Sequence, residues 1–316
     1  MSEVAPRGRV RRHTLAHTAE YLALRGTVAA LDALSWNRAG KLGAVIGSLG
    51  FRPLGIRRAV VESQLRAAFP EKDDAEIGRI ARGSYAHLGR TAIETALLPS
   101  LGRDGIIDLV GTVTGWDALQ EGLRAGRGII LVTGHLGNWE LGGAYLAARG
   151  LPIGAVVRHM ANPRFDRYLN STRAKMGVRV IYDDQAVRQS TRALRDGRVV
   201  AFLADQGVRG LASTFVPFFG RLAKTPRGPA VFALRLDTPL IFGTAIRQPD
   251  GRYHLAFEPI EVTRTDDRER DTDAIVARYT LTLERWVRKA PEQYLWQHNR
   301  WKRRPPGTPP EPAAAP

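Results

Sequence analysis

The residue types best suited to chemistry in this sequence lie in one short segment, TGHLGNWE, which covers residues 133–140. An imidazole can take a proton from a hydroxyl group, and a carboxylate that accepts its other N–H fixes the tautomer and stabilises the imidazolium. Gly134 and Gly137 permit a tight turn that lets the carboxylate of Glu140 fold back toward His135. The spacing therefore predicts a general base, His135, oriented by Glu140. A hydrogen-bonded turn histidine followed by an acid at a helix N-terminus is the structural alternative.

Other catalytic motifs are missing from the sequence. It contains no GxSxG, GxxxxGK[ST] or HExxH, no GxGxxG after an expected strand, and 0 cysteines. A cysteine nucleophile, a disulfide framework and a zinc ribbon are thereby excluded. The attacking oxygen is therefore expected to come from the substrate. A metal site would need further ligands, for which only His159 and Asp205 are candidates, so we expect no metal.

The elements that must position this segment alternate between strands and helices from about residue 106 onward. Strands are expected at 128–133, 153–157, 179–182, 198–203, 239–246 and 254–260, and helices at 139–149, 163–176, 185–195, 226–236 and 272–288. This alternation predicts an α/β fold with a largely parallel central sheet flanked by helices. Ligands bind at the carboxyl ends of the strands in such folds, where His135, Arg158 and Asp205 are expected to lie.

The N-terminal third is expected to be helical. The expected organisation is a basic tail (1–12), a helical membrane-associated region (13–105), an α/β body (106–304) and a disordered Pro/Ala-rich tail (305–316). Residues 41–51 are apolar and glycine-rich but too short to span a membrane. The helices could pack as a cap on the body or lie as an anchor at a membrane interface, with basic residues against anionic headgroups.

The charge balance favours anionic partners. Lys and Arg number 47 against 31 Asp and Glu, a formal net charge of +16. Nucleic acid, an anionic membrane, phosphorylated substrates and acidic proteins all fit this charge. The basic residues are dispersed without a nucleic-acid-binding motif, so no nucleic-acid partner is expected. No transmembrane segment and no signal peptide is recognised, which predicts a protein that stays in the cytoplasm.

Several ordered segments resemble one family. HLGNWE at 135–140 resembles the His-x4-Asp/Glu motif of glycerolipid-type acyltransferases, in the form found in bacterial lipid A late acyltransferases and their phosphatidylinositol mannoside acyltransferase relatives. Four further segments and one dipeptide also resemble that family: RRAVVESQLRAAFP (57–70), Val157-Arg158, LADQG (203–207), FVPFFGRLAKTPRGPAVFALRLDTP (215–239) and QYLWQHNRWKRR (293–304). Ser63-Gln64 stand where that family usually has Asn. The resemblance covers about residues 55–305.

This resemblance implies an O-acyltransferase that moves a fatty acyl chain from a thioester to a hydroxyl of a lipid A precursor or related glycolipid. Acyl carrier protein, which is acidic, is the expected donor, and an anionic lipid or glycolipid is the expected acceptor. The thioester is a co-substrate, and no other cofactor is expected. The expected location is the cytoplasmic face of the inner membrane. A phosphatidylinositol mannoside-type acyltransferase and an acyl-thioester hydrolase are the alternatives.

The resemblance also implies roles for the remaining site residues. Arg158 and the backbone N–H groups near Gly137 and Asn138 would stabilise the thioester oxyanion or hold a phosphate. Asp205 would position the acceptor or Arg158. Lys224 and Arg227 would contact phosphate. The structural alternatives are a strand-capping charge for Arg158, a turn-forming residue for Asp205, and solvated side chains for Lys224 and Arg227.

Overall fold

A computed structural model describes residues 15–207, 210–305 and 307 of the chain. The expected basic tail at 1–12 lies outside the described residues. So does the expected tail at 305–316, apart from residues 305 and 307.

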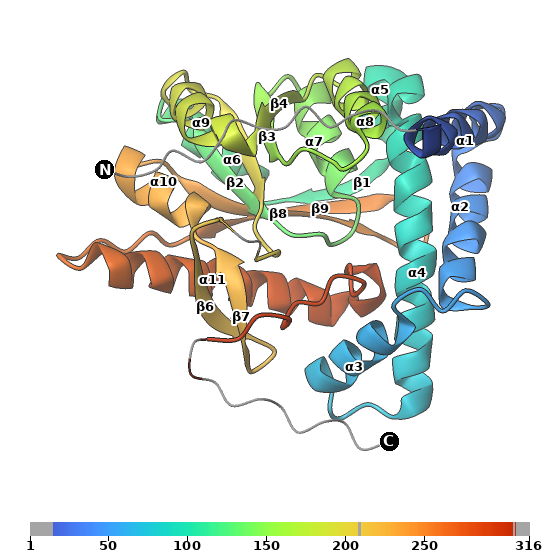
Figure 1. Cartoon of the computed structure of the whole chain (residues 1–316). Helices are drawn as coiled ribbons and strands as arrows, with labels where there is room; N and C mark the ends of the chain where they lie inside the picture. The colour runs from blue at the N-terminus through green and yellow to red at the C-terminus, as the bar shows by residue number, and fades with distance from the viewer. Residues whose placement is uncertain (1–14, 208–209, 306, 308–316) are drawn as a thin grey trace.

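A seven-stranded sheet with the order β1-β9-β8-β2-β5-β3-β4 forms the centre of the molecule (Figure 1). Its strands are β1 (Val110–Thr114), β2 (Ile129–Thr133), β3 (Ile153–Val157), β4 (Arg179–Tyr182), β5 (Val199–Leu203), β8 (Leu240–Arg247) and β9 (Tyr253–Ile260). Strands β8, β2, β5, β3 and β4 run parallel, whereas β9 is antiparallel to β8 and β1 is parallel to β9. The expected α/β fold with a largely parallel sheet is confirmed.

Helices cover both faces of this sheet. They are α5 (Gly102–Asp108), α6 (Trp116–Arg124), α7 (Trp139–Ala148), α8 (Pro163–Lys175), α9 (Ala186–Arg195), α10 (Gly228–Leu236) and α11 (Arg268–Lys289), with short 3-10 turns η1 (Leu98–Leu101), η2 (Asp183–Gln185) and η3 (Pro291–Gln293). Successive strand residues point to opposite faces. Ile130 and Val132 of β2 therefore join the core that includes α10 and α11, and Ile129 and Leu131 join the core that includes α6 and α7. Burial on both faces explains why this strand is a continuous apolar run.

A second, two-stranded sheet lies beside α11 (Figure 1). Strands β6 (Ser213–Phe218) and β7 (Arg221–Pro226) pair antiparallel. No strands were predicted from the sequence in this part of the chain, although segment 215–239 was recognised as a family motif. Phe218 is fully buried at its tip and packs against the rings of Tyr294 and Trp301. The hairpin thus holds the C-terminal segment against the body.

Four helices precede the body: α1 (Leu15–Asp32), α2 (Trp36–Phe51), α3 (Arg58–Ala68) and α4 (Asp74–Leu97). Helix α2 packs on α4 through glycines. A Cβ at Gly47 would lie 2.1 Å from the Tyr85 carbonyl oxygen, and one at Gly89 would lie 2.3 Å from the Gly43 carbonyl oxygen. Because the glycine face of α2 is buried against α4, its opposite face stays exposed, with the side chains of Leu42, Val45, Ile46 and Leu49.

Among the described residues, no helix is both long and apolar enough to cross a bilayer.

Candidate active site

The imidazole of His135 is held by Asp205, which lies at the end of the neighbouring strand. Its Nδ1 lies 2.7 Å from Asp205 Oδ1, and its backbone N–H donates to Asp205 Oδ2 at 3.0 Å. Strands β2 and β5 are paired in parallel up to Thr133 and Leu203. His135 and Asp205 each follow two residues after these paired positions. The sheet register therefore places the two side chains together.

The environment keeps Asp205 ionised. Burial by itself would raise the pKa of this carboxyl, but the charge and hydrogen bonds of His135 lower it to about 2. Asp205 is buried, whereas the His135 side chain is 22% exposed and remains accessible to a substrate. A carboxylate at Nδ1 requires a proton on that nitrogen, so Nε2 of the neutral imidazole carries the lone pair. The arrangement therefore leaves Nε2 of His135 able to accept a proton from a group that reaches it.

Glu140 has a different partner from the one expected. Its carboxylate accepts two hydrogen bonds from Arg173 of α8, from Nε at 3.0 Å and from Nη2 at 2.5 Å. Burial would lower the pKa of Arg173, but the hydrogen bond and charge of Glu140 raise it. Asn138 caps α7, and the first turn of this helix carries Glu140 toward α8. The prediction that Glu140 orients His135 is corrected accordingly: in this structure Asp205 makes that contact.

The backbone amides near the turn are already used within the protein. The N–H of Gly137 donates to the Gln293 carbonyl at 3.0 Å, and that of Asn138 donates to the Ala245 carbonyl at 2.9 Å. The oxyanion role that the family resemblance implied for these two amides is therefore corrected: both N–H groups donate to carbonyls of the protein. Gly137 instead supplies backbone shape, because its φ is +62° and a Cβ there would lie 2.0 Å from the Ala245 oxygen.

Asn138 joins a buried ionic cluster centred on Glu94. The amide of Asn138 donates to Glu94 Oε2 at 3.1 Å, while its own Oδ1 accepts the N–H of Leu141. We call Glu94, Arg90, Arg247, Tyr253 and Asn138 the Glu94 cluster. Arg90 and Glu94 are four residues apart on one helix, and their side chains lie 3.0 Å from each other. This spacing is visible in the sequence, but it does not reveal that Glu94 is buried.

The other contacts of the Glu94 cluster come from β8 and β9. Arg247 forms an ion pair with Glu94, and the hydroxyl of Tyr253 donates to Glu94 at 2.5 Å. Glu94 itself is fully buried. The cluster thus ties helix α4 to the sheet and to the turn that carries His135.

A second histidine supports the same turn from α4. The ring Nε2 of His87 lies 3.0 Å from the Gly137 carbonyl oxygen, so Nε2 carries the proton that it donates. Burial lowers the pKa of His87 to about 4. A small cavity of about 10 Å³ is lined by His87, Trp139 and His135 among others, which shows how closely α4 approaches the site.

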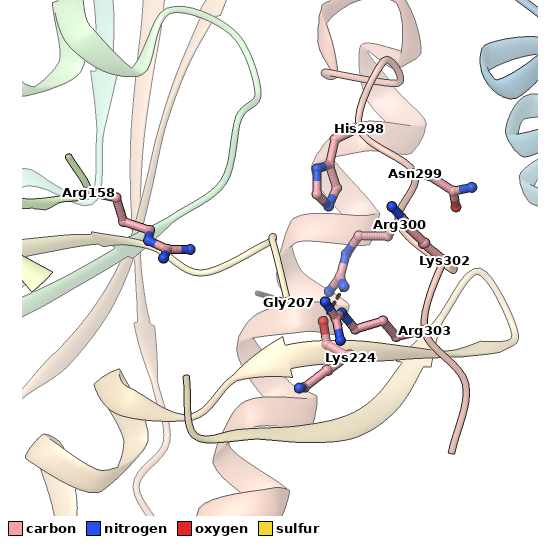
Figure 2. A pocket seen from close by; sticks show the side chains of 8 residues that line it. All are labelled: Arg158, Gly207, Lys224, His298, Asn299, Arg300, Lys302 and Arg303. Carbon is pink, nitrogen blue, oxygen red and sulfur yellow. Dashed lines mark hydrogen bonds between the residues drawn. The ribbon is translucent and has the colours of Figure 1, made fainter. Parts of the chain in front are cut away.

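A larger cavity of about 320 Å³ lies between Arg158 and the C-terminal segment (Figure 2). We call it the basic cavity; its lining residues are Arg158, Gly207, Lys224, His298, Asn299, Arg300, Lys302 and Arg303. Figure 2 shows Arg158 opposite the C-terminal segment that carries His298 to Arg303. Burial lowers the pKa of His298 to about 4, and Asp205 and His135 both act on it electrostatically. Because Gly207 lines it, the cavity lies near the strand end that carries Asp205.

The structure brings two of the three expected phosphate ligands to the basic cavity. Arg158 and Lys224 line it, and Arg158 Nε also lies 2.9 Å from Asp183 Oδ2. Arg227 instead pairs with Glu269 at 2.8 Å and Asp273 at 3.3 Å on α11. The sequence pointed to Arg300 only as a residue of the membrane interface or of C-terminal packing, and it assigned no phosphate contact to Arg300, Lys302 or Arg303.

The two residues considered as further metal ligands have other neighbours. The ring of His159 stacks on Tyr182 with centroids 3.9 Å apart, and its Nδ1 lies 3.6 Å from Asp166 Oδ2. The carboxylate of Asp205 is hydrogen-bonded to His135. Within residues 15–207 and 210–305, no three His, Cys, Asp or Glu side chains are grouped to hold a metal ion.

Comparisons with known proteins identify relatives along most of the chain. The family model described as bacterial lipid A biosynthesis acyltransferase matches residues 11–303. The lipid A biosynthesis lauroyltransferase of Escherichia coli K12 is 29% identical over 271 residues, which are 85% of this chain and 87% of the relative. The palmitoleoyltransferase of the same organism is 28% identical, covering 84% and 85%.

A relative with another acceptor in its name also matches. The phosphatidylinositol mannoside acyltransferase of Mycolicibacterium smegmatis is 26% identical over 215 residues, which are 65% of this chain and 67% of the relative.

Proposed function

Because the chain belongs to the bacterial lipid A biosynthesis acyltransferase family and is an acyltransferase, we propose that it transfers a fatty acyl chain to a hydroxyl of a lipid A precursor, with His135 as the base. The observation that carries the mechanism is the short contact between His135 and Asp205. The chain also matches a phosphatidylinositol mannoside acyltransferase, so a related glycolipid is the second candidate acceptor.

The proposed reaction proceeds in two steps. Nε2 of His135 takes the proton of the acceptor hydroxyl as its oxygen attacks the thioester carbonyl, and a C–O bond forms. Asp205, ionised at neutral pH, stabilises the imidazolium through Nδ1. The tetrahedral intermediate then collapses, the C–S bond breaks, and the imidazolium returns its proton to the leaving thiolate. The products are an ester and a free thiol.

An acyl carrier protein is the donor in this proposal. The net charge of +16 favours an acidic donor, and it favours an anionic acceptor for the same reason. The proposed place of action is the cytoplasmic face of the inner membrane, where such donors and acceptors meet.

The experiment for the chemistry uses purified protein, acylated carrier protein and a detergent-dispersed lipid A precursor, with lipid masses as the readout. The expected product is a lipid heavier by one acyl chain. His135→Ala should abolish transfer, and Asp205→Asn should lower kcat by about 10²–10⁴ because the tautomer and the imidazolium lose support. Far-ultraviolet circular dichroism of both variants checks that they fold. Full turnover by folded His135→Ala would refute the proposed mechanism.

The same assay separates the alternatives. Free fatty acid with an unchanged lipid would identify a thioesterase in which His135 activates water. Transfer to a mannosylated phosphatidylinositol but not to the lipid A precursor would identify the other acceptor class.

The membrane part of the proposal rests on helix α2. Its exposed apolar side chains Leu42, Val45, Ile46 and Leu49 lie at i, i+3, i+4 and i+7, so they form one face. Exposed basic residues lie at both ends of this apolar face: Arg38 and Lys41 in the first two turns of α2, and Arg52 and Arg57 after its last residue. Apolar side chains between cations suit the interface of an anionic bilayer. We propose that this face rests in the membrane.

Co-sedimentation with anionic vesicles tests this contact. Val45→Glu combined with Leu49→Glu should reduce the bound fraction about tenfold or more. The matched control, Val187→Glu combined with Leu281→Glu, changes two exposed apolar residues elsewhere and should bind as the parent protein does. Equal binding by both double variants would exclude the α2 face.

A further inference from the structure

The basic cavity has an unusual charge composition. Five of its eight lining residues are cations, and none is an acid. Within the described part of the chain, the carboxylate that contacts one of these cations is that of Asp183, at the outer residue Arg158. Like charges gathered around a concave surface repel each other, and an anion placed among them relieves that repulsion.

Arg300 shows that the cavity is built rather than a chance group of surface cations. Arg300 is buried, with 3% of its surface exposed. Its guanidinium donates hydrogen bonds of 2.6 Å to the Lys224 carbonyl and to Thr225 Oγ1. Its backbone N–H donates to the Gln64 amide oxygen at 2.6 Å. These acceptors are neutral. The Nε of Arg300 is buried without a hydrogen-bond partner. In the described part of the chain no carboxylate contacts this guanidinium, although its charge helps to lower the pKa of Asp205.

The basic cavity extends to the segment that follows Asp205. Gly207, which lines it, comes two residues after Asp205, and a Cβ at Gly207 would lie 2.5 Å from the Lys224 carbonyl oxygen. His298 lines the same cavity, and the charges of Asp205 and His135 both affect its pKa. A group bound there would lie next to the strand end that carries Asp205.

We propose that the basic cavity binds a phosphate group of a substrate, with Arg300 and Lys224 at its inner side and Lys302, Arg303 and Arg158 around it. Phosphate suits clustered guanidinium and ammonium donors. Two sources share this chemistry: a phosphate on the lipid acceptor, and the phosphodiester of a carrier-bound pantetheine arm. The link to catalysis rests on the proposed function, whereas anion binding does not.

A binding experiment without turnover tests the cavity itself. The probe is inorganic phosphate, titrated by calorimetry into full-length His135→Ala protein. Adding Lys302→Ala and Arg303→Ala should weaken binding about tenfold or more. Both residues lie on the surface or half-buried in the C-terminal segment, so the fold should persist. Lys175→Ala with Arg179→Ala is the matched control, because it removes the same charge at exposed positions near the start of β4 and should leave the affinity unchanged. Equal affinity of the two double variants overturns the proposal.

Kinetic arms then distinguish the two sources, with His135 intact. If the acceptor phosphate is bound, the Lys302→Ala/Arg303→Ala protein has a raised KM for the phosphorylated acceptor and an unchanged KM for the dephosphorylated one. If the donor phosphate is bound, its KM rises for acyl-phosphopantetheine but not for acyl-pantetheine. Unchanged KM values with all four substrates would overturn the role in substrate binding. Phosphate binding by a protein that transfers no acyl chain would refute the proposed function and leave the cavity as an anion site.

Discussion

The Glu94 cluster and the basic cavity are both rich in arginine, yet their charges are arranged in opposite ways. In the Glu94 cluster, Arg90 and Arg247 each contact the carboxylate of Glu94, and the hydroxyl of Tyr253 and the amide of Asn138 complete its hydrogen bonds. In the basic cavity, Arg300 is buried, but its acceptors are a carbonyl and a hydroxyl.

This contrast separates a structural use of charge from a binding use. A buried cation that contacts a carboxylate serves the fold, because its countercharge is already present. Cations held by neutral acceptors around a cavity keep their attraction for an anion from outside. The comparison predicts that changes in the Glu94 cluster affect stability, whereas changes at the rim of the cavity affect substrate binding.

The largest expected effect on stability is that of Glu94→Gln. This change leaves Arg247 and Arg90 without their carboxylate, and the free energy of unfolding should fall by about 3–5 kcal/mol. Urea denaturation measures it. Adding Arg247→Met to Glu94→Gln should recover part of the loss because it removes one uncompensated charge. A loss below about 1 kcal/mol in the single variant would show that the cluster does not depend on charge compensation.

The next effect concerns acid pH and His87. Its pKa is lowered from 6.5 to about 4 by burial, so the folded protein binds fewer protons than the unfolded chain between these values. Stability should therefore be unaffected above pH 6.5 and fall as the pH decreases toward 4, by about 3 kcal/mol at most from this residue. His87→Gln should flatten the profile measured by denaturation at successive pH values. If the pH dependence of stability were the same in the variant, the loss of stability at acid pH would come from other groups. His298 would then be the next residue to replace.

A smaller loss is expected at the ion pair of Glu140 and Arg173. Their side chains are 12% and 16% exposed, and Glu140→Gln should reduce the free energy of unfolding by about 2 kcal/mol, less than for the fully buried Glu94. In the acyl-transfer assay, the folded variant should lose less kcat than Asp205→Asn. If Glu140→Gln instead matched the kinetic loss of Asp205→Asn without loss of stability, Glu140 would belong to the catalytic site.

The smallest expected change is in the stability of Lys302→Ala/Arg303→Ala. Among the residues that the structure describes, these two charges contact no carboxylate, so their removal should alter the free energy of unfolding by about 0.5 kcal/mol or less. Thermal denaturation beside the Lys175→Ala/Arg179→Ala control checks this. A loss of several kcal/mol would mean that these cations serve the fold, and the contrast with the Glu94 cluster would disappear.

Local patterns in the sequence were sufficient for most of the body. The strand expected at 153–157 coincides with β3, and the helix expected at 139–149 corresponds to α7 at 139–148. Apolar runs and helical periodicity are local, so each segment carries its own signal. The hairpin of β6 and β7 was missed because its strands are stabilised by aromatic packing with Tyr294 and Trp301, which are distant in sequence.

The sequence by itself determined that His135 follows a buried strand, between glycines and ahead of a helix, and it predicted that an acid supports the imidazole. Only the tertiary structure decided which acid. Glu140 is five residues away along the chain, but the start of α7 turns it to Arg173. Asp205 is 70 residues away, but the parallel pairing of β2 with β5 places it at 2.7 Å from the imidazole. Strand adjacency depends on how the whole sheet is ordered, and no local pattern contains that order.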